Sequence, residues 1–199
     1  HESFNSLPRG ARVGTSSLRR QSQLRHARPD LEILVLRGNV ETRLRKLDTG
    51  EFDATVLATA GLERLGLADR IRERLSPQQM LPAVGQGVIG IECMEANGQM
   101  RALLAPLEHA PTRCRLEAER AFSGRLGGSC QSPIAAYAEL AGESLNLRGL
   151  VASPDGATVF ADGITGPARE ASALGTALAN RLLAAGAGPL LESLAMGGH

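Results

Sequence analysis

Short apolar runs alternate with amphipathic stretches along the first third of the chain. Each apolar run is followed by a segment of helical composition, and the runs lie at 11–14, 31–36 and 54–58. In the second helical segment Val40, Leu44 and Leu47 recur at i, i+4 and i+7, which is the spacing of one helix face. This alternation predicts a doubly wound α/β domain, a parallel sheet with crossover helices that binds ligands at the carboxyl ends of its strands.

The pattern changes beyond Pro133. Three apolar stretches are separated by the turn residues Ala141-Gly142 and Pro154-Asp155-Gly156, and they lie at 134–140, 145–152 and 158–164. This spacing predicts an antiparallel meander. A helix before it carries the stripe Cys114, Ala118, Ala121 and Phe122, and a helix after it carries the stripe Leu174, Leu178, Leu182 and Ala185. We therefore expect a small α+β domain with a three-stranded antiparallel sheet.

Two features stand between these parts. The segment 81–87 contains Pro82, Gly85 and Gly87, which predicts a hinge. The apolar run 88–93 that follows it predicts one more strand.

Composition excludes several classes of protein. Aromatic residues make up 3% of the 199 residues and Trp is absent, so a protein that stacks nucleic-acid bases is not expected. No apolar run approaches the roughly 20 residues that cross a bilayer. Three widely spaced cysteines and four histidines do not form a disulfide framework or a zinc site, and reduced thiols indicate a reducing compartment.

Charge is distributed unevenly. Between Arg9 and Asp48 ten basic residues face four acidic ones, a net charge of +6, whereas the whole chain carries +1. All of these cations except Lys46 are arginine, whose guanidinium holds carboxylates and phosphates through two hydrogen bonds. The segment predicts a small polyanion as ligand, although a solvated helix face with ordinary surface pairs would have the same composition.

Candidate binding residues follow the predicted strands. Arg19 and Arg20 come after the first strand, Arg37 and Gly38 after the second, and Arg64 in the helix after the third. Arg43 lies at the edge of the helix stripe that begins at Val40 and can reach the same crevice. Backbone N–H groups and hydroxyls at a helix N-terminus form an anion site, and here the turn offers Thr15, Ser16 and Ser17.

Cys130 differs from the other two cysteines. It lies in the Gly-rich loop 127–131, whereas Cys93 and Cys114 lie on apolar stretches. An accessible thiol is a candidate nucleophile or attachment point. No histidine stands at a spacing that would indicate a protease-like Cys/His pair.

Four segments in order resemble the porphobilinogen deaminase (hydroxymethylbilane synthase) family, and the likeness runs from about Arg12 to the C-terminus. They are Val-Gly-Thr-Ser-Ser-Leu-Arg-Arg-Gln at 13–21, Leu-Arg-Gly-Asn-Val-Glu-Thr-Arg-Leu at 36–44, Leu-Pro-Ala-Val-Gly-Gln-Gly at 81–87 and Cys-Gln-Ser-Pro-Ile at 130–134. The family loop usually reads Gly-Gly-Cys, and this chain has Ser129 in place of the second glycine.

The resemblance implies a cytoplasmic, monomeric transferase of porphyrin and heme biosynthesis. In this family a covalent dipyrromethane cofactor is joined by a thioether to the cysteine that matches Cys130. Four porphobilinogens add head to tail with loss of ammonia, and hydrolysis releases the linear hydroxymethylbilane. Porphobilinogen and the growing linear pyrrole chain are the partners, with no nucleic acid, membrane or metal. The implied cofactor and carboxylate contacts are Thr15, Ser16, Ser17, Arg19, Arg20, Arg37, Gly38, Arg43, Arg64 and Gln86.

The resemblance also implies a division into parts. Residues 1–86 form the α/β domain of periplasmic-binding-protein type, 87–108 return to a first domain that is mostly absent, and 109–199 form the α+β domain. The family's catalytic aspartate belongs to that first domain, upstream of this chain. We expect the chain by itself to lack catalysis.

Two other classes of protein fit parts of the pattern. A non-catalytic module of periplasmic-binding-protein type would bind a small carboxylate and be indifferent to Cys130→Ala. A nucleic-acid-binding module that uses the basic segment would lose affinity steeply with salt, but the few aromatics and near-neutral total charge argue against it.

Overall fold

The structure is a computed structural model that describes residues 2–128 and 132–196. A parallel sheet in the first part has the order β2-β1-β3, with β1 at Arg12–Gly14, β2 at Glu32–Leu34 and β3 at Ala54–Thr55. Val13 pairs with Ile33 on one side and with Ala54 on the other. The three predicted strands are confirmed, although each is shorter than the apolar run that predicted it.

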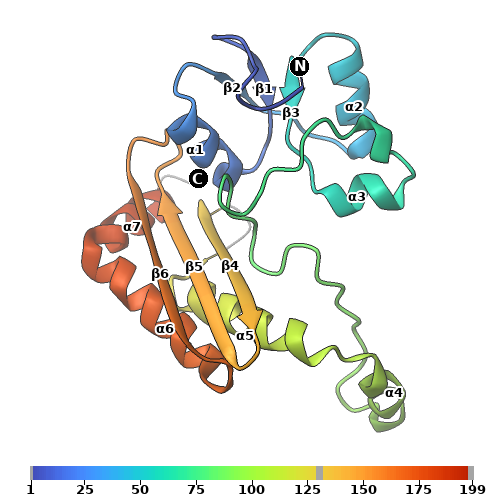
Figure 1. The fold of residues 1–199 in the computed structure, drawn as a ribbon, viewed down its shortest axis with the longest axis vertical. Coiled ribbons are helices and arrows are strands. Elements are labelled where there is room, and N and C mark those ends of the chain that lie inside the picture. Colours follow the sequence, from blue (N-terminus) through green and yellow to red (C-terminus); the bar gives the residue numbers. More distant parts are fainter. Residues whose placement is uncertain (1, 129–131, 197–199) are drawn as a thin grey trace.

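A helix follows each of these strands (Figure 1), namely α1 at Leu18–Ala27, α2 at Val40–Asp48 and α3 at Thr59–Arg64. Side chains cap the first two: Ser17 accepts from the Arg20 amide at 3.4 Å, and Asn39 accepts from the Thr42 amide at 2.8 Å. These bonds satisfy N–H groups that a helix leaves unpaired at its start. Leu24 of α1 packs with Val13 and Ile33, which joins this helix to the sheet.

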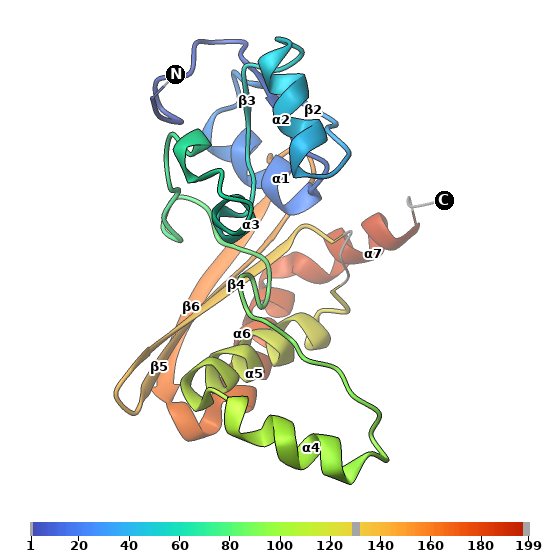
Figure 2. The ribbon, with the colours of Figure 1, turned by 90° about the vertical axis from the view of Figure 1, so that its right-hand side faces the viewer.

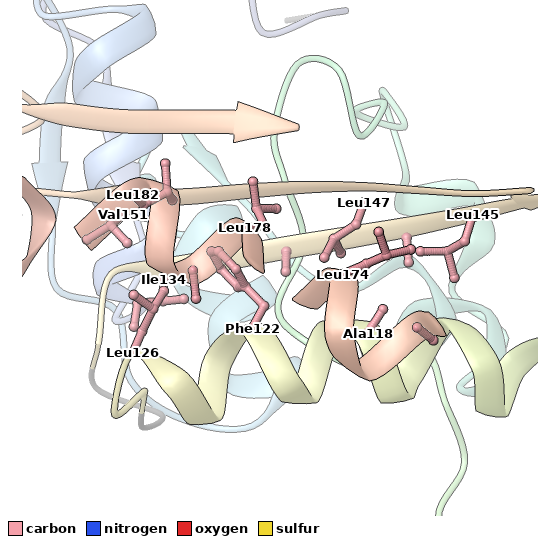
Figure 3. Packing of buried hydrophobic residues seen from close by; sticks show 14 of the residues in the cluster. Ala118, Phe122, Leu126, Ile134, Leu145, Leu147, Val151, Leu174, Leu178 and Leu182 are labelled. Atoms are coloured by element: carbon pink, nitrogen blue, oxygen red, sulfur yellow. The ribbon is translucent and has the colours of Figure 1, made fainter. Parts of the chain in front are cut away.

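The last part is the predicted α+β domain. Strands β4 at Ile134–Ala141, β5 at Ser144–Ala152 and β6 at Val159–Pro167 form an antiparallel sheet in that order. Helices α5 at Ala110–Arg125 and α6 at Ala171–Leu182 pack on it, and α7 at Gly188–Met196 follows. Figure 3 shows Phe122 of α5 and Leu178 of α6 pointing into one core with Leu147 and Val151 of β5.

The prediction of the α6 stripe is wrong at one residue. Leu174, Leu178 and Leu182 are buried, but Ala185 is exposed and Ala187 is buried instead. The cause is a π turn at Leu183–Ala187, in which Gly186 has a φ of 111°. This left-handed residue shifts the helical phase, so the apolar face continues two residues later.

The strand predicted at 88–93 is absent from the described part of the chain. Val88, Ile89, Ile91 and Cys93 are exposed and form no ladder. Alone, the run has no neighbouring strand with which to pair its backbone groups. The short helix α4 at Gly98–Leu104 comes next, and Figure 2 shows it standing away from both sheets.

Four short elements complete the order. Three are 3-10 turns, at Ala68–Arg70, Ala105–Leu107 and Ala168–Glu170, and the fourth is the π turn already described. Within residues 2–128 and 132–196 no helix has both the length and the apolar character needed to cross a membrane.

Candidate functional site

The turn between β1 and α1 is fixed by its own hydrogen bonds. Thr15 is buried; its amide donates to the Leu34 carbonyl at 2.9 Å, and its hydroxyl accepts from the Ser17 amide at 3.2 Å. Ser17 caps the helix and Ser16 is exposed. The turn therefore presents the first residues of α1 at the carboxyl end of the central strand, where parallel sheets bind ligands.

Arg19 is buried, with 7% of its surface exposed. Its Nη1 donates to the Leu81 carbonyl at 2.8 Å. Burial, with the nearby charge of Arg20 as the second cause, lowers the pKa of Arg19 to about 10. The side chain is still cationic at neutral pH, so a desolvated positive charge is held in place by a neutral oxygen.

Arg20 is held in a similar way. Its Nη1 donates to the Val56 carbonyl at 2.8 Å. Its pKa is lowered by burial and then by the charge of Arg43, whose Nε donates to the Gly38 carbonyl at 2.8 Å. Across the described residues no carboxylate forms an ion pair with any of these three arginines. Together they form a cluster of cations without counterions.

A cavity of about 500 Å³ opens beside this cluster. Arg19, Arg20 and Gln86 line it, together with apolar side chains that include Val56 and Met80. Two carboxylates also line it, and both have partners: Asp53 pairs with Arg12, and Glu73 accepts from the Phe4 amide. Thr15, Ser16, Ser17, Arg37, Gly38, Arg43 and Arg64 are not among its lining residues. Arg37 and Arg64 are exposed and form no hydrogen bond or ion pair within the described ranges.

Two further arginines, which sequence reasoning missed, also line the cavity. Arg70 pairs with Asp48 at 2.5 Å, and Arg72 is exposed. The available signal in the sequence was the close spacing of charged residues at 70–74, which read Arg-Ile-Arg-Glu-Arg. They follow no predicted strand, so position along the chain did not associate them with the other arginines.

Glu119 is a second buried group that the sequence did not reveal. It lies on α5 with 7% of its surface exposed, and it accepts from the Gly85 amide at 2.7 Å and the Ala138 amide at 2.9 Å. Burial raises its pKa, although both amides act in the opposite direction. This carboxylate ties the hinge segment to β4, and its position beside Ala118 on an apolar stripe was the only signal.

Gln86 stands next to that anchor. It is exposed and lines both the arginine cavity and a second groove of about 790 Å³ between the hinge and α5. The hinge predicted at 81–87 therefore lies between the arginine cavity and the groove beside α5.

The candidate attachment residue, Cys130, lies outside the described residues. The described cysteines are free: Cys93 is exposed, and Cys114 is half-buried with its Sγ 3.3 Å from the Ala168 carbonyl. Burial raises the pKa of the Cys114 thiol, which disfavours the reactive thiolate. Among the residues that the structure describes, no cluster of three or more His, Cys, Asp and Glu could hold a metal ion.

Comparison with known families decides the identity. Residues 1–102 match the family model described as the dipyromethane cofactor binding domain of porphobilinogen deaminase, and residues 113–184 match that of its C-terminal domain. The chain belongs to the porphobilinogen deaminase family. The first match includes the parallel sheet and the arginine cluster, and the second includes the antiparallel sheet with α5 and α6.

Members of the porphobilinogen deaminase family are transferases of the hydroxymethylbilane synthase type, which act on porphobilinogen in porphyrin and heme biosynthesis. The named cofactor-binding domain carries the unpaired arginines of this chain. A ligand with several carboxylates is the chemical complement of such a cluster.

Proposed function

We propose that the protein is a hydroxymethylbilane synthase, which joins four porphobilinogens head to tail with loss of ammonia and releases a linear tetrapyrrole. The proposal is carried by Arg19, which is buried, and by its neighbour Arg20, which is half-buried. Both donate to backbone carbonyls, and neither has a carboxylate partner in the described structure. Each pyrrole of the substrate carries an acetate and a propionate, so the growing chain is a polyanion that needs fixed cations.

The geometry of the two guanidiniums supports this role. Each has five N–H donors, and each uses one of them for a hydrogen bond to a backbone carbonyl, that of Leu81 for Arg19 and that of Val56 for Arg20. These bonds orient the planar groups and leave donors for bidentate contact with a carboxylate. Gln86 offers an amide to the same cavity. Arg37, Gly38, Arg43, Arg64 and the Thr15–Ser17 turn are proposed to contact other carboxylates of the ligand.

Cys130 is proposed to hold the dipyrromethane cofactor through a thioether. When bound, the cofactor supplies the terminal pyrrole to which substrate units are added. The cysteine follows Gly127 and Gly128 after the end of α5 and precedes β4, so both ends of its loop are anchored to the C-terminal domain. The free thiols of Cys93 and Cys114 support a reducing compartment, and we propose a cytoplasmic monomer.

Intact mass tests the attachment. The purified chain is incubated with porphobilinogen, beside Cys130→Ala and the control Cys93→Ala, whose cysteine is exposed. We expect the mass of two linked pyrrole units on the parent chain and the control, and no added mass on Cys130→Ala. An adduct that persists in Cys130→Ala would contradict the attachment site.

The chain by itself is proposed to bind but not to catalyse. No aspartate in it matches the catalytic motif of the family, and its segment 88–93 lacks a sheet neighbour in the described structure. Repeated turnover of porphobilinogen, beyond the two units taken up on Cys130, should therefore be absent with this chain alone. If an extended chain that includes the family's first domain shows no turnover of porphobilinogen either, the assignment is wrong.

A small-carboxylate-binding module is the second candidate, favoured by a cavity in which Arg19 and Arg20 stand among apolar side chains. Such a module would bind a pyrrole or other carboxylate equally well before and after Cys130→Ala. It would also take up no covalent mass, which separates it from the first candidate.

A further inference from the structure

The far end of helix α1 contacts the C-terminal domain. The turn between β5 and β6, residues 153–158, lies against it (Figures 1 and 2). Arg25 Nη1 donates to the Pro154 carbonyl at 2.7 Å, and His26 Nδ1 lies 3.1 Å from the Gly156 carbonyl oxygen. These contacts join segments about 130 positions apart, one in each of the two family domains.

Gly156 is the point of closest approach. It is buried and has a φ of +73°, and a Cβ atom there would lie 2.6 Å from the His26 amide nitrogen and 2.7 Å from the Ser22 carbonyl oxygen. The backbone of the turn therefore rests directly on the backbone of α1. Only glycine satisfies both the left-handed conformation and this contact.

The turn is held in shape by its own hydrogen bonds. The Ser153 amide donates to the Thr158 carbonyl at 2.8 Å, and the Thr158 amide donates to the Ser153 hydroxyl at 2.9 Å. Asp155 accepts from the Ala157 amide at 3.0 Å and from the Ser153 hydroxyl. Because of these internal hydrogen bonds, the turn packs against α1 as a rigid unit.

A second attachment lies less than one helical turn earlier on α1. Gln23 donates to the Leu81 carbonyl at 3.0 Å and accepts from the Leu81 amide at 2.8 Å. The Leu81 side chain packs in the small cluster of Ala135, Leu150 and Ala152, which belongs to the antiparallel sheet. Helix α1 therefore contacts the C-terminal domain through the turn and through the hinge.

From these contacts we infer that the β5–β6 turn is an interdomain latch, in which Gly156 and Arg25 fix α1 against the C-terminal domain. The inference concerns how the two domains are coupled and does not depend on what the arginine cluster binds. Its consequence for the cluster is geometric: Arg19 and Arg20 stand on the same helix as the latch contacts. Release of the latch frees the helix that carries them.

Amide hydrogen exchange tests the latch with two matched glycines. Gly142, in the β4–β5 turn, has a φ of +59° and no atom within 4 Å of its would-be Cβ. Gly156→Ala and Gly142→Ala introduce comparable left-handed strain, but only the first meets α1. We expect amides of 18–27 to exchange about tenfold faster in Gly156→Ala and at the parent rate in Gly142→Ala. Equal rates in the two variants would overturn the latch.

Arg25 provides a test that leaves the turn unchanged. Arg25→Met removes the donor to the Pro154 carbonyl and a longer bond, 3.4 Å, to the Ile33 carbonyl of β2, and Arg25→Lys restores one donor. We expect faster exchange of 18–27 in Arg25→Met and a partial return toward the parent rate in Arg25→Lys. Amides of 134–141, which form β4, should keep their rates in both. Parent-like exchange of 18–27 in Arg25→Met and Gly156→Ala together would rule out the inference.

Discussion

Burial of the Arg19 charge carries a desolvation cost in the ligand-free protein, and a bound carboxylate would offset that cost. Its charge is desolvated, and its bonded partner is a neutral carbonyl. An incoming carboxylate would neutralise the charge while the Leu81 bond keeps the guanidinium in place. Binding strength at such a site comes from a cation that is oriented before the ligand arrives.

Arg19→Met separates binding from folding. We expect affinity for porphobilinogen to fall about 10- to 100-fold, the equivalent of losing a hydrogen bond to a charged group, as measured by titration calorimetry. The free energy of unfolding should change little or increase, because a buried unpaired charge is removed. Arg45→Met, on the exposed face of α2, is the control and should leave both quantities unchanged.

Glu119 predicts a pH dependence of stability. The folded protein holds this proton more tightly than the unfolded chain, since burial raises the pKa above its ordinary value of 4.5. The free energy of unfolding that Glu119 contributes therefore falls as pH rises through the interval above 4.5. Urea unfolding of Glu119→Gln from about pH 4 to 7 should show the variant gaining on the parent as pH rises. Glu192→Gln, at an exposed position, should not show this trend.

At the scale of elements, periodicity in the sequence predicted most of the fold. The three strand-helix units and the antiparallel meander are present because each apolar run finds a neighbouring strand to pair with in its own domain. The run 88–93 failed as a strand because a strand requires a neighbour, which periodicity cannot supply. The buried role of Glu119 and the contact of Gly156 with α1 were missed for the same reason: their partners lie 19 to 130 positions away.

The contact between α5 and β5 provides a test of packing. A Cβ at Gly149 would come within 2.5 Å of Phe122 ring atoms, and Phe122 is fully buried. We expect Gly149→Ala to lower the free energy of unfolding by about 1–3 kcal/mol through overpacking. Phe122→Leu replaces the aromatic ring with a smaller side chain. In that background Gly149→Ala should therefore lower the free energy of unfolding by about 1 kcal/mol less. Additive costs in a urea-unfolding double-mutant cycle would contradict this packing.

At the scale of the whole molecule, the exposed arm between the domains is the weakest segment. Residues 86–103 are exposed throughout, and few buried contacts hold α4 in place. Local opening in such a segment costs little free energy compared with the packed cores.

Limited trypsin digestion should therefore cut first after Arg101, which is exposed on α4. We expect this cleavage to be about tenfold or more faster than any cut within the two cores, as followed by intact mass. Arg101→Gln should abolish the first product and preserve the later ones. An earlier cut inside α1 or α5 would mean that the arm is not the least protected segment.

Helix α1 contacts both domains, and these contacts decide what happens to the protein after cleavage at Arg101. Leu81, Gly85 and α1 lie before the arm, while their partners in β5, the β5–β6 turn and Glu119 lie after it. A break in the chain at Arg101 therefore leaves these contacts intact. The two pieces should elute together from a sizing column, so the protein can be supplied as two separately made halves that reassemble.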